Sequence, residues 1–277
     1  MTLLLQTLDV IAGLNPEDEQ QPEKRIEVER TPELEEILAL YDTFIERLIE
    51  NLGFVHIYSH LFTSQSLLQN LVTLPYSAQI ITQASIALSS KNSFHLGQFL
   101  TALVQRSGEQ SHIIYALEPL QHVGIRLDGK DLRIVGNVGN HAAYSMISGN
   151  LIVEGNAGSH AAYMMSGGML HVRGNVQDFA FNMGSGGEVV VDGSAGNYAG
   201  RFLMGGSLLI KKNCGDFLGS YLAGKATITV LGATGEQVGL EMNGGVIKLY
   251  GTHSLSPPSG GYIYHKDSLI VPKGSGA

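Results

Sequence analysis

The chain has no tryptophan, one cysteine and only 15% charged residues among its 277 residues. The single cysteine, Cys214, excludes an internal disulfide framework and fits the reducing cytoplasm. No apolar run reaches the roughly 18 residues that a membrane-spanning helix needs. The start, Met1–Leu5, is too short for the apolar region of a secretion signal and lacks a basic flank. We therefore expect a cytoplasmic protein without membrane insertion.

Basic residues are scarce at the start of the chain. Residues 1–50 hold 13 acidic and 4 basic side chains, whereas the remaining residues hold 12 acidic and 13 basic ones. No basic surface is therefore expected to attract nucleic acid. The acidic segment has two interpretations that stay open: it docks on a basic protein partner, or it is a solvated acidic face.

Glycine is also scarce before residue 124, where only 4 of the 35 glycines lie. That change in composition predicts two parts. Residues 1–30 are expected to be an acidic, partly flexible segment, and residues 31–118 a helical domain. Thr31 and Pro32 predict the start of its strongest helix, which ends near Gly53. Further helices are expected at 54–73, 77–89 and 93–106.

His56 and His60 lie four residues apart on one of these expected helices. This spacing can hold a metal ion, but the zinc-protease pattern also needs glutamate directly after the first histidine, and Ile57 stands there. We therefore expect packed or surface histidines, and no metal site in the chain.

The remainder of the chain is a repeat. Similar segments begin at Gly136, Gly155, Gly174, Gly193, Lys212, Gly232 and Gly251, in steps of 19 or 20 residues. Each unit has a Gly-x-x-Gly turn, a stretch of small residues that usually ends in Gly-Gly, and a short strand of alternating pattern. These features predict a right-handed parallel β-helix of 19-residue coils over 124–251, followed by a C-terminal cap and tail over 252–277. The whole protein is thus expected to be α+β in two parts.

Stacked coils place equivalent residues in columns about 4.8 Å apart. One outward column alternates in charge and predicts ion pairs between neighbouring strands; its members are Glu154, Arg173, Asp192 and Lys211. A second column is expected to stack flat side chains; its members are His141, His160, Phe179, Tyr198, Phe217 and Gln237. The alternation of sign and the shared ring shape both support the coil register.

Few residues of the repeat suggest chemistry. His141 and His160 occupy equivalent positions, with Tyr144 and Tyr163 three residues on, so these four form the candidate ligand-binding group. Cys214 aligns with small apolar residues and is expected to be buried rather than nucleophilic. A Gly-x4-Gly-Lys match at 219–225 lacks the following serine or threonine and lies inside a coil, so nucleotide binding is not expected. No catalytic residue and no cofactor is predicted.

The Gly-x-x-Gly turn, the Gly-Gly pair and the 19-residue step over residues 124–251 resemble the GXGXG solenoid family. That family includes the C-type subunits of formylmethanofuran dehydrogenase and of the related formyltransferase/hydrolase complex, and the C-terminal domain of the glutamate synthase large chain. The resemblance implies an architectural role that holds other proteins in place, without an active site. Glutamate synthase activity is excluded, because the chain has Thr2 where an N-terminal cysteine is needed.

We therefore expect a non-catalytic adaptor or scaffold subunit whose partners are other protein subunits of a cytoplasmic complex. The alternative is a component like the C-type subunits of a formylmethanofuran dehydrogenase or formyltransferase/hydrolase complex. A third possibility is a ligand-binding protein that uses the face carrying His141 and His160.

Overall fold

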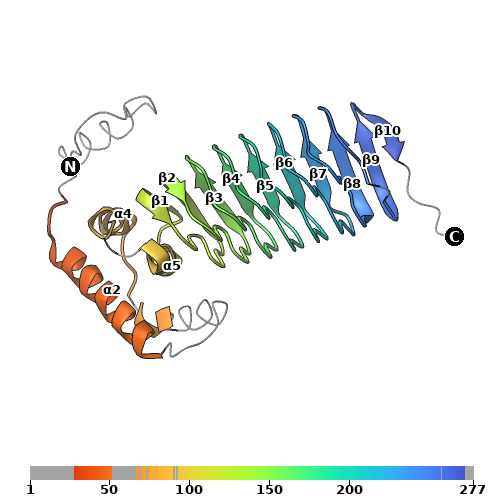
Figure 1. Ribbon diagram of the computed structural model, residues 1–277. Helices are drawn as coiled ribbons and strands as arrows, with labels where there is room; N and C mark the ends of the chain where they lie inside the picture. Colours follow the sequence, from red (N-terminus) through yellow and green to blue (C-terminus); the bar gives the residue numbers. More distant parts are fainter. Residues whose placement is uncertain are drawn as a thin grey trace, which may run out of the picture.

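A computed structural model describes most of the chain, namely residues 28–51, 67–68, 70–72, 74–89, 91, 93–256 and 258–271. In these residues ten strands form one sheet in chain order, and helices pack at its first strand (Figure 1). The helices are α2 (Pro32–Asn51), α4 (Ala78–Ala87) and α5 (Ser93–Arg106). None of them is long and apolar enough to cross a membrane.

The strands are short and regularly spaced. They are β1 (Ser111–Leu120), β2 (Lys130–Val138), β3 (Gly149–Val153), β4 (Met169–Val172), β5 (Glu188–Val191), β6 (Ser207–Ile210), β7 (Thr227–Val230), β8 (Asn243–Leu249), β9 (Gly260–His265) and β10 (Ser268–Val271). Every neighbouring pair from β1–β2 to β8–β9 is parallel. The chain therefore winds as a β-solenoid, as the repeat predicts.

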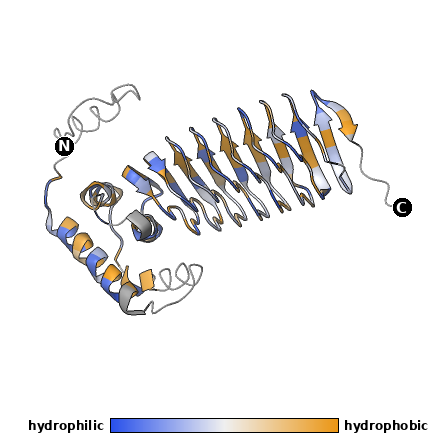
Figure 2. Cartoon of the chain, in the orientation of Figure 1, coloured by the Kyte–Doolittle hydropathy of each residue, from blue (hydrophilic) through white to orange (hydrophobic). Residues whose placement is uncertain are grey.

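The register of the coils is also confirmed. Leu132 pairs with Leu151, and Leu151 pairs with Leu170. The inward residues of each strand are buried, and exposed or half-buried residues alternate with them (Figure 2). These side chains fill the inside of the coils and join the buried helix residues in one hydrophobic core. The helical part and the solenoid are thus a single packed body.

The turns of the solenoid have an unusual backbone. In one coil His141, Ala143 and Ser145 all have positive φ, and the same alternate positions do so in its neighbours. Their amides point alternately along the stack: His141 and Ser145 donate to the next coil, and Ala143 donates to the preceding one. A left-handed non-glycine residue costs about 1–2 kcal/mol. The coil-to-coil hydrogen bonds offset this cost because they satisfy every second amide of a turn packed on the core.

The helical part begins as predicted. Thr31 Oγ1 accepts a hydrogen bond from the amide of Leu34 at 3.2 Å, and α2 starts at Pro32. Rings from two helices pack together, since Tyr41 and Phe44 of α2 contact Phe99 of α5. Most of the helix expected at 54–73, with His56 and His60, lies outside the described residues.

The predicted boundary between the two parts needs correction. Residues 111–118, expected in the helical domain, belong to β1, so the sheet begins 13 residues before the expected start at 124. The segment alternates exposed Ser111 and Ile113 with buried His112 and Ile114, which is a strand pattern. β1 lacks the glycine turn of the later coils, and the glycine alignment therefore missed it.

Helix α4 covers the open edge of β1. Thr82 Oγ1 donates to the carbonyl of Ile113 at 2.7 Å, and Ser85 Oγ accepts from the amide of Tyr115 at 3.1 Å. An uncovered edge strand presents unpaired backbone groups that can pair with another chain. Two hydroxyls of α4 thus close the first edge of the solenoid.

Replacing Ser85 with alanine is expected to lower the free energy of unfolding by about 1–3 kcal/mol, because the buried amide of Tyr115 loses its acceptor. Ser89→Ala is the matched control, since the Ser89 hydroxyl bonds only the nearby carbonyl of Ile86. Urea denaturation of both variants measures the difference. Equal losses would contradict the edge-closing role of Ser85.

The other end of the solenoid closes with a hairpin. β9 pairs in parallel with β8, and β10 turns back antiparallel to β9. This agrees with the one or two capping strands expected after the last coil. Lys266 and Asp267 form the turn with positive φ.

Candidate functional site

The predicted column of flat side chains is present. Ring centroids of neighbouring coils lie 4.6–5.0 Å apart, and their planes differ by at most 25°. The stack runs through His141, His160, Phe179, Tyr198 and Phe217. It also includes His122, whose ring lies 5.2 Å from that of His141. His122 was not predicted because it precedes the first glycine motif, although it stands 19 residues before His141.

Burial makes the stacked histidines poor bases. The pKa of His141 is lowered to about 4 by burial, and the neighbouring His122 and His160 lower it further. Burial also lowers the pKa of His160, against an opposing effect of Asp178. The buried Nδ1 of His141 has no hydrogen-bond partner among the described residues. These rings are therefore neutral at pH 7, and they are held by packing more than by polar contacts.

The four candidate ligand-binding residues lie together. Tyr144 stacks on Tyr163 at 5.5 Å, and His141 and His160 each contact the tyrosine of their own coil edge-on. Each tyrosine hydroxyl is directed to a methionine of the next coil, since that of Tyr163 lies 3.1 Å from Met183 Sδ. The group is thus continuous in space, and its rings already contact one another.

This geometry does not suit metal binding. Two ligands about 2.1 Å from one zinc ion lie at most about 4.2 Å apart. The rings of His141 and His160 are 5.0 Å apart and stacked face to face. In the described part of the chain, no three histidine, cysteine, aspartate or glutamate side chains are grouped as metal ligands.

The predicted charge column forms two separate clusters. Glu154 binds Arg173 at 2.9 Å and also Arg133 at 2.7 Å. Asp192 binds Lys211 at 2.8 Å and lies 3.0 Å from His171. The hydrogen bond from Lys211 is the main cause that lowers the pKa of Asp192. The carboxylates on this strand face are therefore engaged in neighbouring ion pairs, an arrangement that leaves no acid–base pair for catalysis.

Two other motifs behave as the repeat predicts. Cys214 is buried in the column of small residues, and burial raises the pKa of its thiol to about 12. The segment 219–225 leads directly into β7 and not into a helix, so it lacks the strand–loop–helix context of a phosphate loop.

The turns also carry polar ladders that were not predicted. The side-chain oxygen of Asn137 accepts from the amide of Asn156, and that of Asn156 accepts from Asn175, each at 2.8 Å. A second ladder joins Asp178, Asn197 and Asp216 in the same way. The signal was available, because asparagine or aspartate recurs every 19 residues. These side chains are used to hold one coil on the next.

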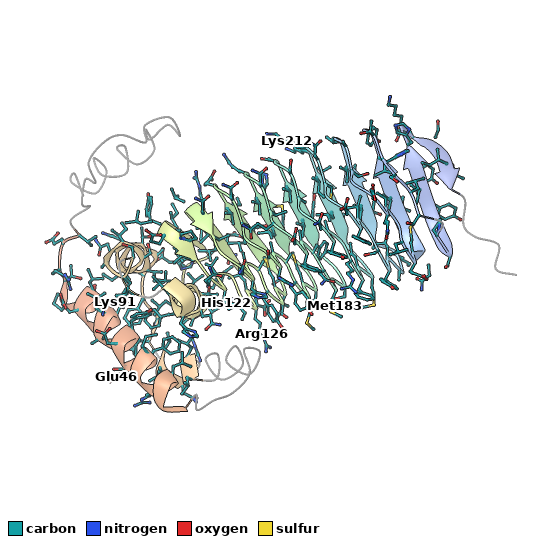
Figure 3. All side chains as sticks on the ribbon, viewed as in Figure 1. Glu46, Lys91, His122, Arg126, Met183 and Lys212 are labelled. Atoms are coloured by element: carbon teal, nitrogen blue, oxygen red, sulfur yellow. The ribbon has the colours of Figure 1, made fainter. Side chains whose placement is uncertain are left out.

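One long edge of the solenoid remains unused by such contacts. Four residues after each ring of the stack lies a side chain directed outward, and we name this set the edge column: Arg126, Ser145, Met164, Met183, Phe202, Tyr221 and Glu241. Met164, Met183 and Tyr221 are 46%, 42% and 40% exposed. The guanidinium of Arg201 lies 4.5 Å from the Phe202 ring centre beside them. Arg126 and Met183 both lie along this edge (Figure 3).

Comparison with known proteins adds no relative to this description. The chain matches no known family model, no curated protein and no solved structure. Any functional conclusion therefore depends on the fold and on the contacts described above.

Proposed function

We propose that the chain is a non-catalytic scaffold or adaptor subunit of a cytoplasmic multiprotein complex, related to the GXGXG solenoids. The observation that carries the proposal is the use of polar side chains within the solenoid. The histidines stack, the carboxylates pair with bases, and the amides hold successive coils together. Apolar side chains fill the inside of the coils, and function is left to the outer surfaces of a rigid body.

The acidic face of α2 is the proposed docking surface for a basic partner protein. Glu33 and Glu46 are exposed on this helix, and Asp42 and Glu35 on the same helix are already paired with Lys91 and Arg30. The buried stripe of α2 faces the core, so its charged side is directed away from the protein (Figure 3). Complementary charge speeds association and excludes partners of the same sign.

Affinity purification of the full chain from its native host tests this proposal. Stable partners in fixed ratio are expected, and Glu33→Lys/Glu46→Lys is expected to release those that bind α2. Glu118→Lys/Glu188→Lys is the matched control, because it makes the same charge change at exposed residues of the sheet. Recovery of the chain without any other protein would contradict the proposal. The identity of the partners separates a general scaffold from a formyl-transferring complex.

A ligand site at the histidine face remains the competing hypothesis. His141→Ala/His160→Ala would lower the affinity of any ligand bound there. Metal analysis and ligand binding on the purified protein measure this directly. Unchanged binding in the double variant would end that hypothesis.

A further inference from the structure

The edge column has a charge order that selects a particular partner. Arg126 stands at the helical end, Glu241 stands at the hairpin end, and Met164, Met183, Phe202 and Tyr221 fill the middle. Arg126 and Glu241 are both exposed, and no ion pair found in the described residues includes either. Met183 lies three coils from each of them.

We propose that this edge column is a self-association surface, on which a second copy of the chain binds antiparallel about a twofold axis at Met183. Six coil steps separate Arg126 from Glu241, which is about 29 Å at about 4.8 Å per coil. A twofold axis at the middle coil places Arg126 of each copy opposite Glu241 of the other. The same rotation places Met164 opposite Phe202, and Met183 opposite itself.

Charge distinguishes this arrangement from the alternatives. A parallel alignment would place arginine opposite arginine and glutamate opposite glutamate, which is repulsive at both ends. A displacement by one coil would leave both charged ends facing uncharged side chains. The apolar middle supplies the attraction, because contiguous exposed apolar surface on a soluble protein marks an interaction site. Exposed Ile147 and Met204 widen the strip beside the edge column.

The size of the strip sets the expected affinity. A stable interface buries about 800 Å² on each partner. A column one residue wide with a few flanking side chains is narrower than that. We therefore expect a reversible dimer with a dissociation constant in the micromolar range, roughly 1–100 µM.

Sedimentation of the full chain over about 1 to 200 µM tests the proposal. A monomer–dimer equilibrium is expected, and Met183→Glu is expected to weaken it roughly a hundredfold, because two carboxylates then meet on the axis. Leu231→Glu is the matched control: Leu231 is 46% exposed but lies at the end of the strand region, away from the edge column. It should leave the equilibrium unchanged. A wild-type chain that stays monomeric, or a dimer that Met183→Glu leaves intact, would overturn the proposal.

Charge exchange gives a second test that does not depend on apolar contacts. Arg126→Glu and Glu241→Arg are each expected to weaken the dimer about tenfold, because each creates two like-charged contacts. The double variant restores opposite charges and should return to the wild-type equilibrium. Failure of the double variant to recover would exclude the antiparallel register. Neither test involves α2, so the outcome is independent of the docking surface proposed above.

A cysteine at the axis checks the geometry directly. Met183→Cys should form a disulfide-linked dimer on mild oxidation, because the two copies of this residue face each other. Leu231→Cys should not, and the native Cys214 is buried. Equal cross-linking of both variants would contradict the twofold axis at Met183.

Discussion

Replacing Gly149 with alanine is expected to lower the free energy of unfolding by about 3 kcal/mol or more. Gly149 has a φ of +85° and starts β3 against the preceding coil. A Cβ atom there would overlap the carbonyl oxygen of Lys130, which is backbone and cannot move aside cheaply. The variant therefore combines left-handed strain with a clash inside the stack. For a domain of this size we expect the melting temperature to fall by roughly 6–12 °C.

Two other glycines separate these causes. Gly129 also has a positive φ, +68°, but a Cβ atom there would have nothing within 4 Å, so Gly129→Ala should cost only about 1–2 kcal/mol. Gly108 is equally open and has no such φ, so Gly108→Ala should stay within about 0.5 kcal/mol of the wild type. Denaturation followed by circular dichroism measures all three. Equal losses at Gly129 and Gly149 would show that close coil stacking is not the cause.

The stability of the protein is expected to decrease as the pH falls from 6.5 to 4. The folded-state pKa of His141, about 4, is below its ordinary value of 6.5. Between these values the unfolded chain binds a proton that the folded chain does not, so protonation favours unfolding. The difference corresponds to at most about 3 kcal/mol, and partial exposure of the ring reduces the expected loss to about 2 kcal/mol. The lowered pKa of His160 acts in the same direction.

The variant His141→Phe/His160→Phe should remove much of this pH dependence. Both histidines have a φ of +61°, which Phe179 and Phe217 also adopt in the same stack, so phenylalanine fits the backbone. The change also removes the unpartnered Nδ1 of His141. Thermal unfolding at pH 7.5 and pH 4.5 is the measurement. Tyr198→Phe, in the same stack and without a group that titrates in this range, is the control and should keep the wild-type dependence. Parallel pH profiles for wild type and the double phenylalanine variant would refute the assignment.

Much of the solenoid could be predicted because its information is local and repeated. Each strand carries the same inward pair, such as Leu151 and Val153, and a one-residue error in register would expose every such pair to water. Glycines at fixed spacing gave the turns, and the ring column gave an independent check of the register. The same reasoning failed at β1, whose Ser111 to Leu120 carries no glycine turn and is recognised as a coil only through its pairing with β2.

The candidate site could be predicted only in part. The closeness of His141, His160, Tyr144 and Tyr163 followed from the 19-residue step. Their neutral, stacked state did not, because it depends on burial beneath neighbouring turns. The two charge clusters differ from the predicted continuous ladder for a similar reason: Arg133 and His171, from other columns, compete for the same carboxylates.

The sequence by itself determined the coil, its length, its inward residues and the columns, because a 19-residue period leaves one stacking register that buries the apolar pairs. Tertiary structure alone decided how the coil ends and which edge is left open. The hydroxyls of Thr82 and Ser85 meet β1 only after α4 has packed on it. The outward direction of Met164, Met183 and Tyr221 depends on left-handed turns that coil-to-coil hydrogen bonds stabilise. Contacts of this kind join residues far apart in the chain, and local pattern carries no record of them.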